Sequence, residues 1–192
     1  MIRAVHPELA AAYQDEVAQM LAGRFGTAKA RRESIPQFRI GTARLQGLFA
    51  PQDGAAKYLL ARIAAAKRSI RVLAFSFTSA LMIDTLLERA RAGVQVQVVL
   101  ESQNATGQNA AFARLREAGL DVLLDGNCYN MHHKMLVIDE QTVITGSYNF
   151  TNSAERSNDE NTVIVDDRDL AAAFTVEFGR VYAQALNPAR CQ

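Results

Sequence analysis

Residues 129–151 read YNMHHKMLVIDEQTVITGSYNFT, and the fold can be worked out from this stretch. Two runs rich in apolar and β-branched residues are separated by a short polar segment, which predicts two antiparallel strands joined by a turn. His132 and Lys134 are two residues apart, so on a strand both side chains lie on one face. His133 therefore lies on the opposite face.

The second strand carries a matching pair of polar residues. Ser147 and Asn149 are also two residues apart and share a face. A two-residue turn at 140–141 would place His132 opposite Asn149 and Lys134 opposite Ser147. This register predicts one patch of four polar side chains, whereas a slip of one residue would divide them between both faces.

The chemistry of this patch points to an anionic substrate. A histidine can act as a nucleophile or as an acid and base near neutral pH. The lysine, the asparagine amide and the serine hydroxyl can donate hydrogen bonds to a developing anion. No carboxylate cluster suits a hard cation. We expect a site for phosphate that uses no metal and no cofactor.

A zinc site built from Cys128, His132, His133 and Cys191 is disfavoured because these residues lack paired-ligand spacing.

The rest of the chain alternates strands with helices. Apolar runs of strand length are separated by segments with helical spacing of apolar residues. The expected strands are 44–51, 70–77, 94–100, 120–124 and 161–167, and the expected helices are 54–69, 79–93, 109–119 and 168–186. This order predicts an α/β fold with a mixed, largely parallel sheet and helices on both faces.

Length and composition fit one domain, or one domain with an appendage. The chain has 192 residues, of which 49% are apolar and 21% charged, and its net charge is +1. This balance disfavours a wholly basic nucleic-acid-binding protein. The two cysteines are too few for a disulfide framework, and no apolar run has the length of a membrane span or a signal peptide. A cytoplasmic location is the expectation.

The N-terminus repeats a pattern found near the C-terminus. ELAAAYQDEVAQML at 8–21 resembles DLAAAFTVEFGRVY at 169–182. Either two alanine-rich helices look alike by composition, or the chain begins with the closing helix of a preceding repeat. We divide the chain accordingly.

The divisions are an N-terminal helix at 1–26, a linker at 27–39, a catalytic domain at 40–187 and a tail at 188–192. The basic residues at 29–32 are expected to be solvated, with guidance of a polyanion as the alternative.

The spacing within 132–149 resembles a known signature. His132-x-Lys134, Asp139 and Gly146-Ser147-x-Asn149 match the HKD motif of the phospholipase D superfamily. The similarity covers roughly residues 40–187. It is strongest to single-motif bacterial nucleases and to the C-terminal half of two-motif bacterial proteins, and it implies the phospholipase D/nuclease fold with one motif copy.

The resemblance implies a role for each motif residue. His132 would attack phosphorus to form a phosphohistidine, and Lys134 and Asn149 would hold the non-bridging oxygens with help from Ser147. Glu160, with Glu155 as an alternative, would orient the imidazole of His132.

Two other motif residues, Asp139 in the turn and Gly146, are expected to be structural. Tyr148 and Phe150 are expected in the core, and Glu101 is interpreted as ordinary polarity at a strand end.

The family's chemistry uses two histidines, whereas this chain carries one motif. A homodimer could supply the second histidine, or the chain could be the second half of a two-motif protein. The expected function is a metal-independent phosphodiesterase, foremost an endonuclease on DNA or RNA. The alternatives are a phospholipase D-type hydrolase or transferase on phospholipid head groups, or an inactive half.

Overall fold

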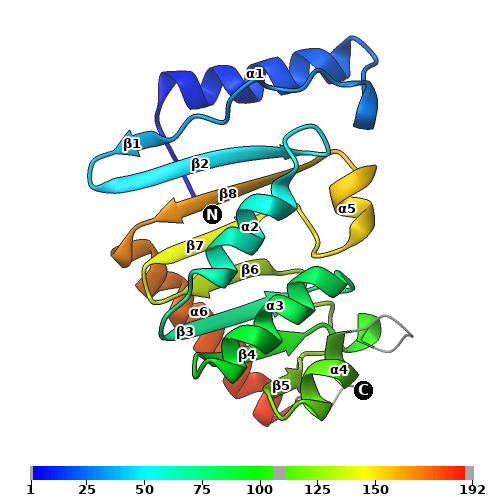
Figure 1. The fold of residues 1–192 in the computed structure, drawn as a ribbon, viewed down its shortest axis with the longest axis vertical. Helices are drawn as coiled ribbons and strands as arrows, with labels where there is room; N and C mark the ends of the chain where they lie inside the picture. Colours follow the sequence, from blue (N-terminus) through cyan, green and yellow to red (C-terminus); the bar gives the residue numbers. More distant parts are fainter. Residues whose placement is uncertain (1, 106–110, 189–192) are drawn as a thin grey trace.

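The computed structural model describes residues 2–105 and 111–188. Within them, an eight-stranded sheet has the order β1-β2-β8-β7-β6-β3-β4-β5 (Figure 1). The strands are β1 (Phe38–Ile40), β2 (Ala43–Ala50), β3 (Ser69–Ala74), β4 (Gln95–Leu100), β5 (Asp121–Leu124), β6 (Lys134–Ile138), β7 (Thr142–Gly146) and β8 (Glu160–Asp166). The helices are α1 (Pro7–Leu21), α2 (Ala55–Ala64), α3 (Ala80–Arg91), α4 (Ala111–Glu117), α5 (Asn152–Arg156) and α6 (Arg168–Leu186), with 3-10 turns η1 (Gly26–Ala28) and η2 (Ser102–Asn104).

The sheet is mixed, as predicted, but it is not largely parallel. Among the named strands, the pairs β3–β4 and β4–β5 are parallel, and α3 and α4 provide the crossovers. The pairs β1–β2, β2–β8, β8–β7, β7–β6 and β6–β3 are antiparallel. The prediction failed because alternation of strands and helices along the chain does not state which strands become neighbours.

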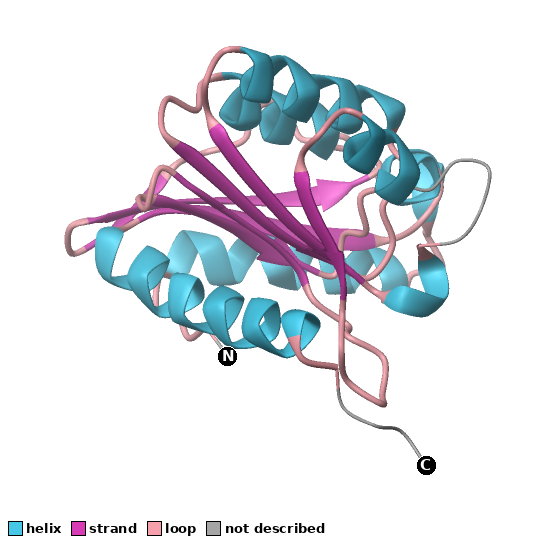
Figure 2. Cartoon of the chain, turned by 90° about the horizontal axis from the view of Figure 1, so that it is seen from below, coloured by secondary structure: helices cyan, strands magenta, loops and turns pink. Residues whose placement is uncertain are grey.

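Helices cover both faces of the sheet, as predicted (Figure 2). On one face, Leu59 of α2 and Leu86 of α3 are fully buried against strand residues such as Leu136. On the other face, Phe178 of α6 packs in a cluster with Val137. Burial of one such side chain stabilises the fold by about 1.5–3 kcal/mol, so the helices packed on the two faces stabilise the sheet between them.

The N-terminal segment is part of this packing. Leu9 of α1 is buried with Phe38, Leu45 and Val165 in a smaller cluster on the same face as α6. Strand β1 begins at Phe38, inside the segment 27–39 that was interpreted as a linker.

Two other expectations concern the ends and helices of the chain. The proposed tail at 188–192 lies, apart from Pro188, outside the described residues. Across residues 2–105 and 111–188, every helix is too short or too polar to span a membrane.

The β6–β7 turn lies one residue earlier than predicted. Asp139 and Glu140, not Glu140 and Gln141, occupy the turn, with φ of 53° and 55°. The amide of Gln141 donates to the carbonyl of Ile138 at 3.0 Å, and Ile138 pairs with Thr142. The predicted register is therefore wrong. Aspartate tolerates the left-handed conformation better than most residues, and a tertiary contact of Asp139, described below, stabilises this turn.

Candidate active site

The motif residues other than Asp139 gather at one edge of the sheet, where several strands begin or end. Strands β3, β4 and β7 end there at Ala74, Leu100 and Gly146, and β6 and β8 begin there at Lys134 and Glu160. His132 precedes β6, and Ser147 and Asn149 follow β7, so three of the four predicted residues lie outside the strands. The one-residue shift in register therefore does not divide them between the two faces, because the loop ends, and not the β-ladder, position them.

His132 and Lys134 form a pair at this edge. His132 is exposed, and its Nε2 lies 3.2 Å from Nζ of Lys134, which also donates to the carbonyl of His132 at 3.2 Å. The ring of Phe75 packs against the imidazole at 4.5 Å and lies 4.8 Å from the Lys134 ammonium. Burial lowers the pKa of Lys134, while the negative charge of Glu160 acts in the opposite direction.

Ser147 and Glu160 form a second pair beside the first. The hydroxyl of Ser147 donates to Oε2 of Glu160 at 2.5 Å and accepts the backbone N–H of Asn161 at 3.0 Å. The carboxylate of Glu160 also accepts a hydrogen bond from the amide of Asn158 at 3.2 Å. In this structure Glu160 thus bonds Ser147, whereas the orienting bond from Glu160 to the imidazole of His132 stays a prediction.

Gly146 and Asn149 lie on either side of Ser147 in the chain. A Cβ at Gly146 would clash with the backbone of Asn161, so only glycine permits β7 to approach β8 this closely. Oδ1 of Asn149 is buried and has no hydrogen bond among the described residues. A buried polar atom without a partner is costly, which makes Asn149 a candidate to reorganise when a ligand binds.

The residues expected in the core lie there. Tyr148 and Phe150 are each 2% exposed. The hydroxyl of Tyr148 donates to Glu155 at 2.9 Å, and the same carboxylate accepts the N–H of Ala56 at 3.0 Å. Burial, and next the charge of Glu155, raise the pKa of Tyr148. Glu155 is thereby engaged in tying α5 to the start of α2, away from the imidazole of His132.

The two other histidines lie elsewhere. His133 faces the opposite side of the sheet, where its Nε2 lies 3.0 Å from Glu177 of α6. His6 precedes α1 and its ring packs against Phe38 at 4.8 Å. Of the chain's three histidines, His132 is therefore the one placed beside Lys134.

Glu101 contributes more to the site than its position after a strand predicts. This carboxylate is only 1% exposed, accepts the N–H of Gln103 at 3.1 Å and forms a short hydrogen bond with the N–H of Met131. Met131 directly precedes His132, so Glu101 holds the segment that carries the imidazole. A single acidic residue after a strand gave no signal for this contact, because its partner is distant in sequence.

Asp139 lies at the other end of β6. Its carboxylate accepts the backbone N–H groups of Lys67, Arg68 and Ser69 at 2.8, 2.7 and 3.0 Å. Asp139 therefore ties the hairpin turn to the start of β3 and is far from the pair His132–Lys134.

The possible metal ligands among the described residues do not cluster. Residues 2–105 and 111–188 contain no group of three or more His, Cys, Asp or Glu side chains arranged to bind a metal ion. Cys191 of the disfavoured zinc set lies outside the described residues.

Known proteins share this sequence and fold. A family model described as the phospholipase D-like domain of cardiolipin synthase matches residues 59–182. Phospholipase D of Rickettsia prowazekii is 33% identical over 126 residues, which cover 66% of this chain and 62% of that protein. Mitochondrial cardiolipin hydrolase of Xenopus laevis is 35% identical over 132 residues, covering 69% and 63%. The chain thus spans 62% to 63% of the length of these relatives.

Solved structures agree with the fold. The crystal structure of Nuc from Salmonella typhimurium, a phospholipase D family member, is 32% identical with a TM-score of 0.70, and the match covers 74% of this chain and 95% of that one. NucT from Helicobacter pylori shares the fold with a TM-score of 0.69 at 21% identity, over 73% of this chain and 96% of that one. The range matched by the family model includes residues 132–160, which assemble the site, and this chain belongs to the phospholipase D superfamily.

Proposed function

We propose that this protein is a phosphodiesterase in which His132 is the nucleophile, and that a nucleic acid is its substrate. The observation that carries the proposal is the exposed imidazole of His132, whose Nε2 lies 3.2 Å from the ammonium of Lys134. A nucleophile beside a cation suits attack on an anionic phosphorus centre, because the cation stabilises the charge that develops on the non-bridging oxygens.

In the proposed reaction, a ring nitrogen of His132 forms a bond to phosphorus while the bond from phosphorus to the leaving oxygen breaks. Lys134 and the amide of Asn149 hold the non-bridging oxygens. A second histidine gives its proton to the leaving oxygen and then accepts a proton from the water that cleaves the phosphohistidine. Glu160 orients the imidazole of His132, which requires its carboxylate to exchange or share the bond to Ser147.

The second histidine is proposed to come from another copy of this chain. His6 and His133 cannot serve, since His133 contacts α6 on the opposite face and His6 packs on Phe38. A twofold contact through the sheet edge would bring two His132 residues together. An alternative source is a first-half domain on a separate or longer polypeptide. Full activity of a protein that sediments as a monomer would contradict the need for a second histidine.

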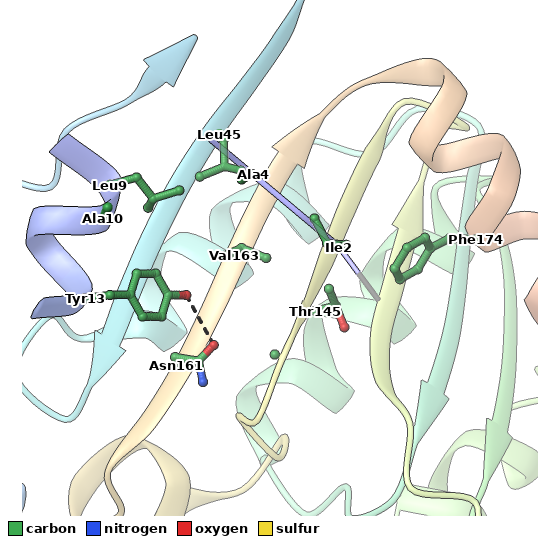
Figure 3. A pocket seen from close by; sticks show the side chains of 11 residues that line it. Ile2, Ala4, Leu9, Ala10, Tyr13, Leu45, Thr145, Asn161, Val163 and Phe174 are labelled. Carbon is green, nitrogen blue, oxygen red and sulfur yellow. Dashed lines mark hydrogen bonds between the residues drawn. The ribbon is translucent and has the colours of Figure 1, made fainter. Parts of the chain in front are cut away.

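Nucleic acid is favoured as substrate because the motif of residues 132–149 resembles that of single-motif bacterial nucleases. One observation favours phospholipid instead. A cavity of about 480 Å³ lies between α1 and α6, lined by apolar residues that include Leu9, Val163 and Phe174 (Figure 3). The cavity lies on the α6 face of the sheet, and its lining residues Gly146 and Asn161 directly neighbour Ser147 and Glu160 in the chain. An acyl chain in this cavity would reach the site around the ends of β7 and β8.

The test begins with hydrolysis of bis(p-nitrophenyl) phosphate in excess EDTA. We expect turnover by the wild type and a loss of at least about 1,000-fold in His132→Asn, since removing a nucleophile removes the covalent route. His133→Asn is the matched control and should retain activity, because the neighbouring histidine faces the other side of the sheet. Equal activity of the two variants would refute the assignment of His132.

Substrate class follows from a panel of single-stranded DNA, double-stranded DNA, RNA, and vesicles of phosphatidylcholine with cardiolipin. Cleavage of a nucleic acid but not of the vesicles would support the favoured reading, and the reverse would support the phospholipid alternative. A folded protein without activity on any substrate would indicate a non-catalytic binding module.

A further inference from the structure

A buried lysine, Lys29, connects the N-terminal segment to Asp159, which directly precedes Glu160 of the candidate site. The side chain of Lys29 is fully buried, although it lies in a basic stretch expected to be solvated. Its ammonium forms a short ion pair with Glu16 of α1 and lies 2.6 Å from the carboxylate of Asp159. The amide of Gln52 donates to the other oxygen of Glu16 at 2.6 Å. A charge that is fully removed from water requires such partners.

Asp159 is the residue directly before Glu160. Besides Lys29, its carboxylate accepts the backbone N–H of Gly26 at 2.8 Å. On the other side of Glu160 in the chain, Asn161 accepts a hydrogen bond at its Oδ1 from the hydroxyl of Tyr13, at 3.4 Å (Figure 3). The side chains of the residues on both sides of Glu160 are therefore bound to residues 13–29.

The buried ammonium of Lys29 depends on both of its carboxylate partners. Burial would lower the pKa of Lys29, but its bonds to Asp159 and Glu16 outweigh burial, and the pKa is raised. The ammonium is thus charged at neutral pH and is compensated only where both carboxylates reach it. An apolar contact would tolerate sliding of the 157–161 segment, whereas an ion cluster fixes the position of Asp159.

We propose that Tyr13, Glu16 and Lys29, called the N-terminal clamp, position Glu160 for catalysis by holding Asp159 and Asn161. The inference rests on the proposed phosphodiesterase function and makes Lys29 a positioning residue, since it touches neither His132 nor the substrate. The clamp lies outside residues 59–182, the part matched by the family model. It assigns the N-terminal segment a role in the site, whatever its origin.

The test uses Asp159→Asn in the whole protein. This change keeps the size of the side chain and leaves Lys29 paired with Glu16, so the cluster loses one charge without stranding another. The second variant, Glu16→Gln with Lys29→Met, loosens the clamp from its other side. Asp84→Asn is the control, since it breaks an ion pair with Arg114 that joins α3 to α4, away from residues 159–161.

Two measurements are made on each variant. Hydrogen exchange of the peptide spanning 157–162 reports whether the segment is held, and kinetics on bis(p-nitrophenyl) phosphate report whether Glu160 is positioned. We expect faster exchange and a fall in kcat of about 10- to 100-fold with KM nearly unchanged, because small displacements of a catalytic group are costly. The control should alter neither.

A double-mutant cycle separates positioning from general damage. In a Glu160→Gln background, Asp159→Asn should cost less than about twofold in kcat, because the residue that it positions is already disabled. An equal loss in both backgrounds would overturn the inference, as would unchanged exchange or unchanged kcat in the single variants. A wild type that shows no hydrolysis overturns the proposed function instead, and exchange then decides whether the clamp holds the segment.

Discussion

The turn residue Asp139 provides the most direct test of which motif residues are structural. Replacement by alanine removes the acceptor of three backbone N–H groups, those of Lys67, Arg68 and Ser69. A hydrogen bond to a charged group stabilises a fold by about 1.5–3 kcal/mol, but two of these three are exposed and water replaces them in part. We therefore assign them about 2 kcal/mol together.

The backbone adds a second contribution. Asp139 has a φ of 53°, a conformation that costs alanine about 1 kcal/mol more than it costs aspartate or asparagine. The expected loss in Asp139→Ala is thus about 3 kcal/mol. Asp139→Asn keeps the backbone preference and one acceptor oxygen, so its loss should be about half as large.

The pH dependence of stability follows from the same contacts. Burial would raise the pKa of Asp139, but the three N–H groups and the charge of Arg68 outweigh burial, so the pKa lies below its ordinary 3.8. The carboxylate therefore contributes its full stabilisation above the unfolded-state pKa and loses it as pH falls through the lower folded-state pKa. Relative to wild type, Asp139→Asn should lose less stability on acidification below pH 3.8.

The assay is urea denaturation followed by circular dichroism, with kinetics on bis(p-nitrophenyl) phosphate well below the transition. Five strand positions separate Asp139 from Lys134, about 16 Å, so folded Asp139→Asn should retain the wild-type kcat. Glu140→Gln, in the same turn, is the control and should change stability by less than about 0.5 kcal/mol. An Asp139→Asn protein of wild-type stability but without activity would refute the structural role.

Two further substitutions probe the site edge. In Gly146→Ala the new Cβ meets the backbone of Asn161, so β7 and β8 must separate. We expect the free energy of unfolding, measured by thermal denaturation, to fall by at least about 2 kcal/mol, and kcat to fall as well. Wild-type values of both would contradict the close approach. Glu101→Gln weakens the buried hydrogen bond to the N–H of Met131 and should lower the free energy of unfolding by about 1–3 kcal/mol. We also expect a lower kcat, because the segment that carries His132 is loosened. Reduced stability with unchanged kcat would show that Glu101 supports only the fold.

Much of the site could be predicted because it depends on local spacing. The spacing His132-x-Lys134 predicts two side chains on one side, and the structure brings them to 3.2 Å although His132 precedes β6, while His133 lies toward α6. Burial of Tyr148 and Phe150 likewise follows from apolar alternation. The order of the longer strands and helices was predicted for the same reason, since periodicity is a property of neighbouring residues, whereas the short elements β1 and α5 were not predicted.

Features that depend on distant residues could not be predicted. Nothing near Lys29 in the sequence indicates that Glu16 and Asp159 converge on it, so a stretch that looks solvated holds a fully buried charge. The hairpin register failed in the same way, because the acceptor Asp139 finds its donors in residues 67–69.

The sequence by itself determined the strand and helix periods, the motif of residues 132–149 and the pairing of His132 with Lys134. Only the tertiary structure decided that most strands pair antiparallel, that Glu160 bonds Ser147, and that the N-terminal segment reaches the catalytic edge. The physical reason is the distance in sequence between the interacting residues. Side-chain direction along one element is set by the local backbone geometry, whereas hydrogen bonds and ion pairs between elements depend on which surfaces pack together.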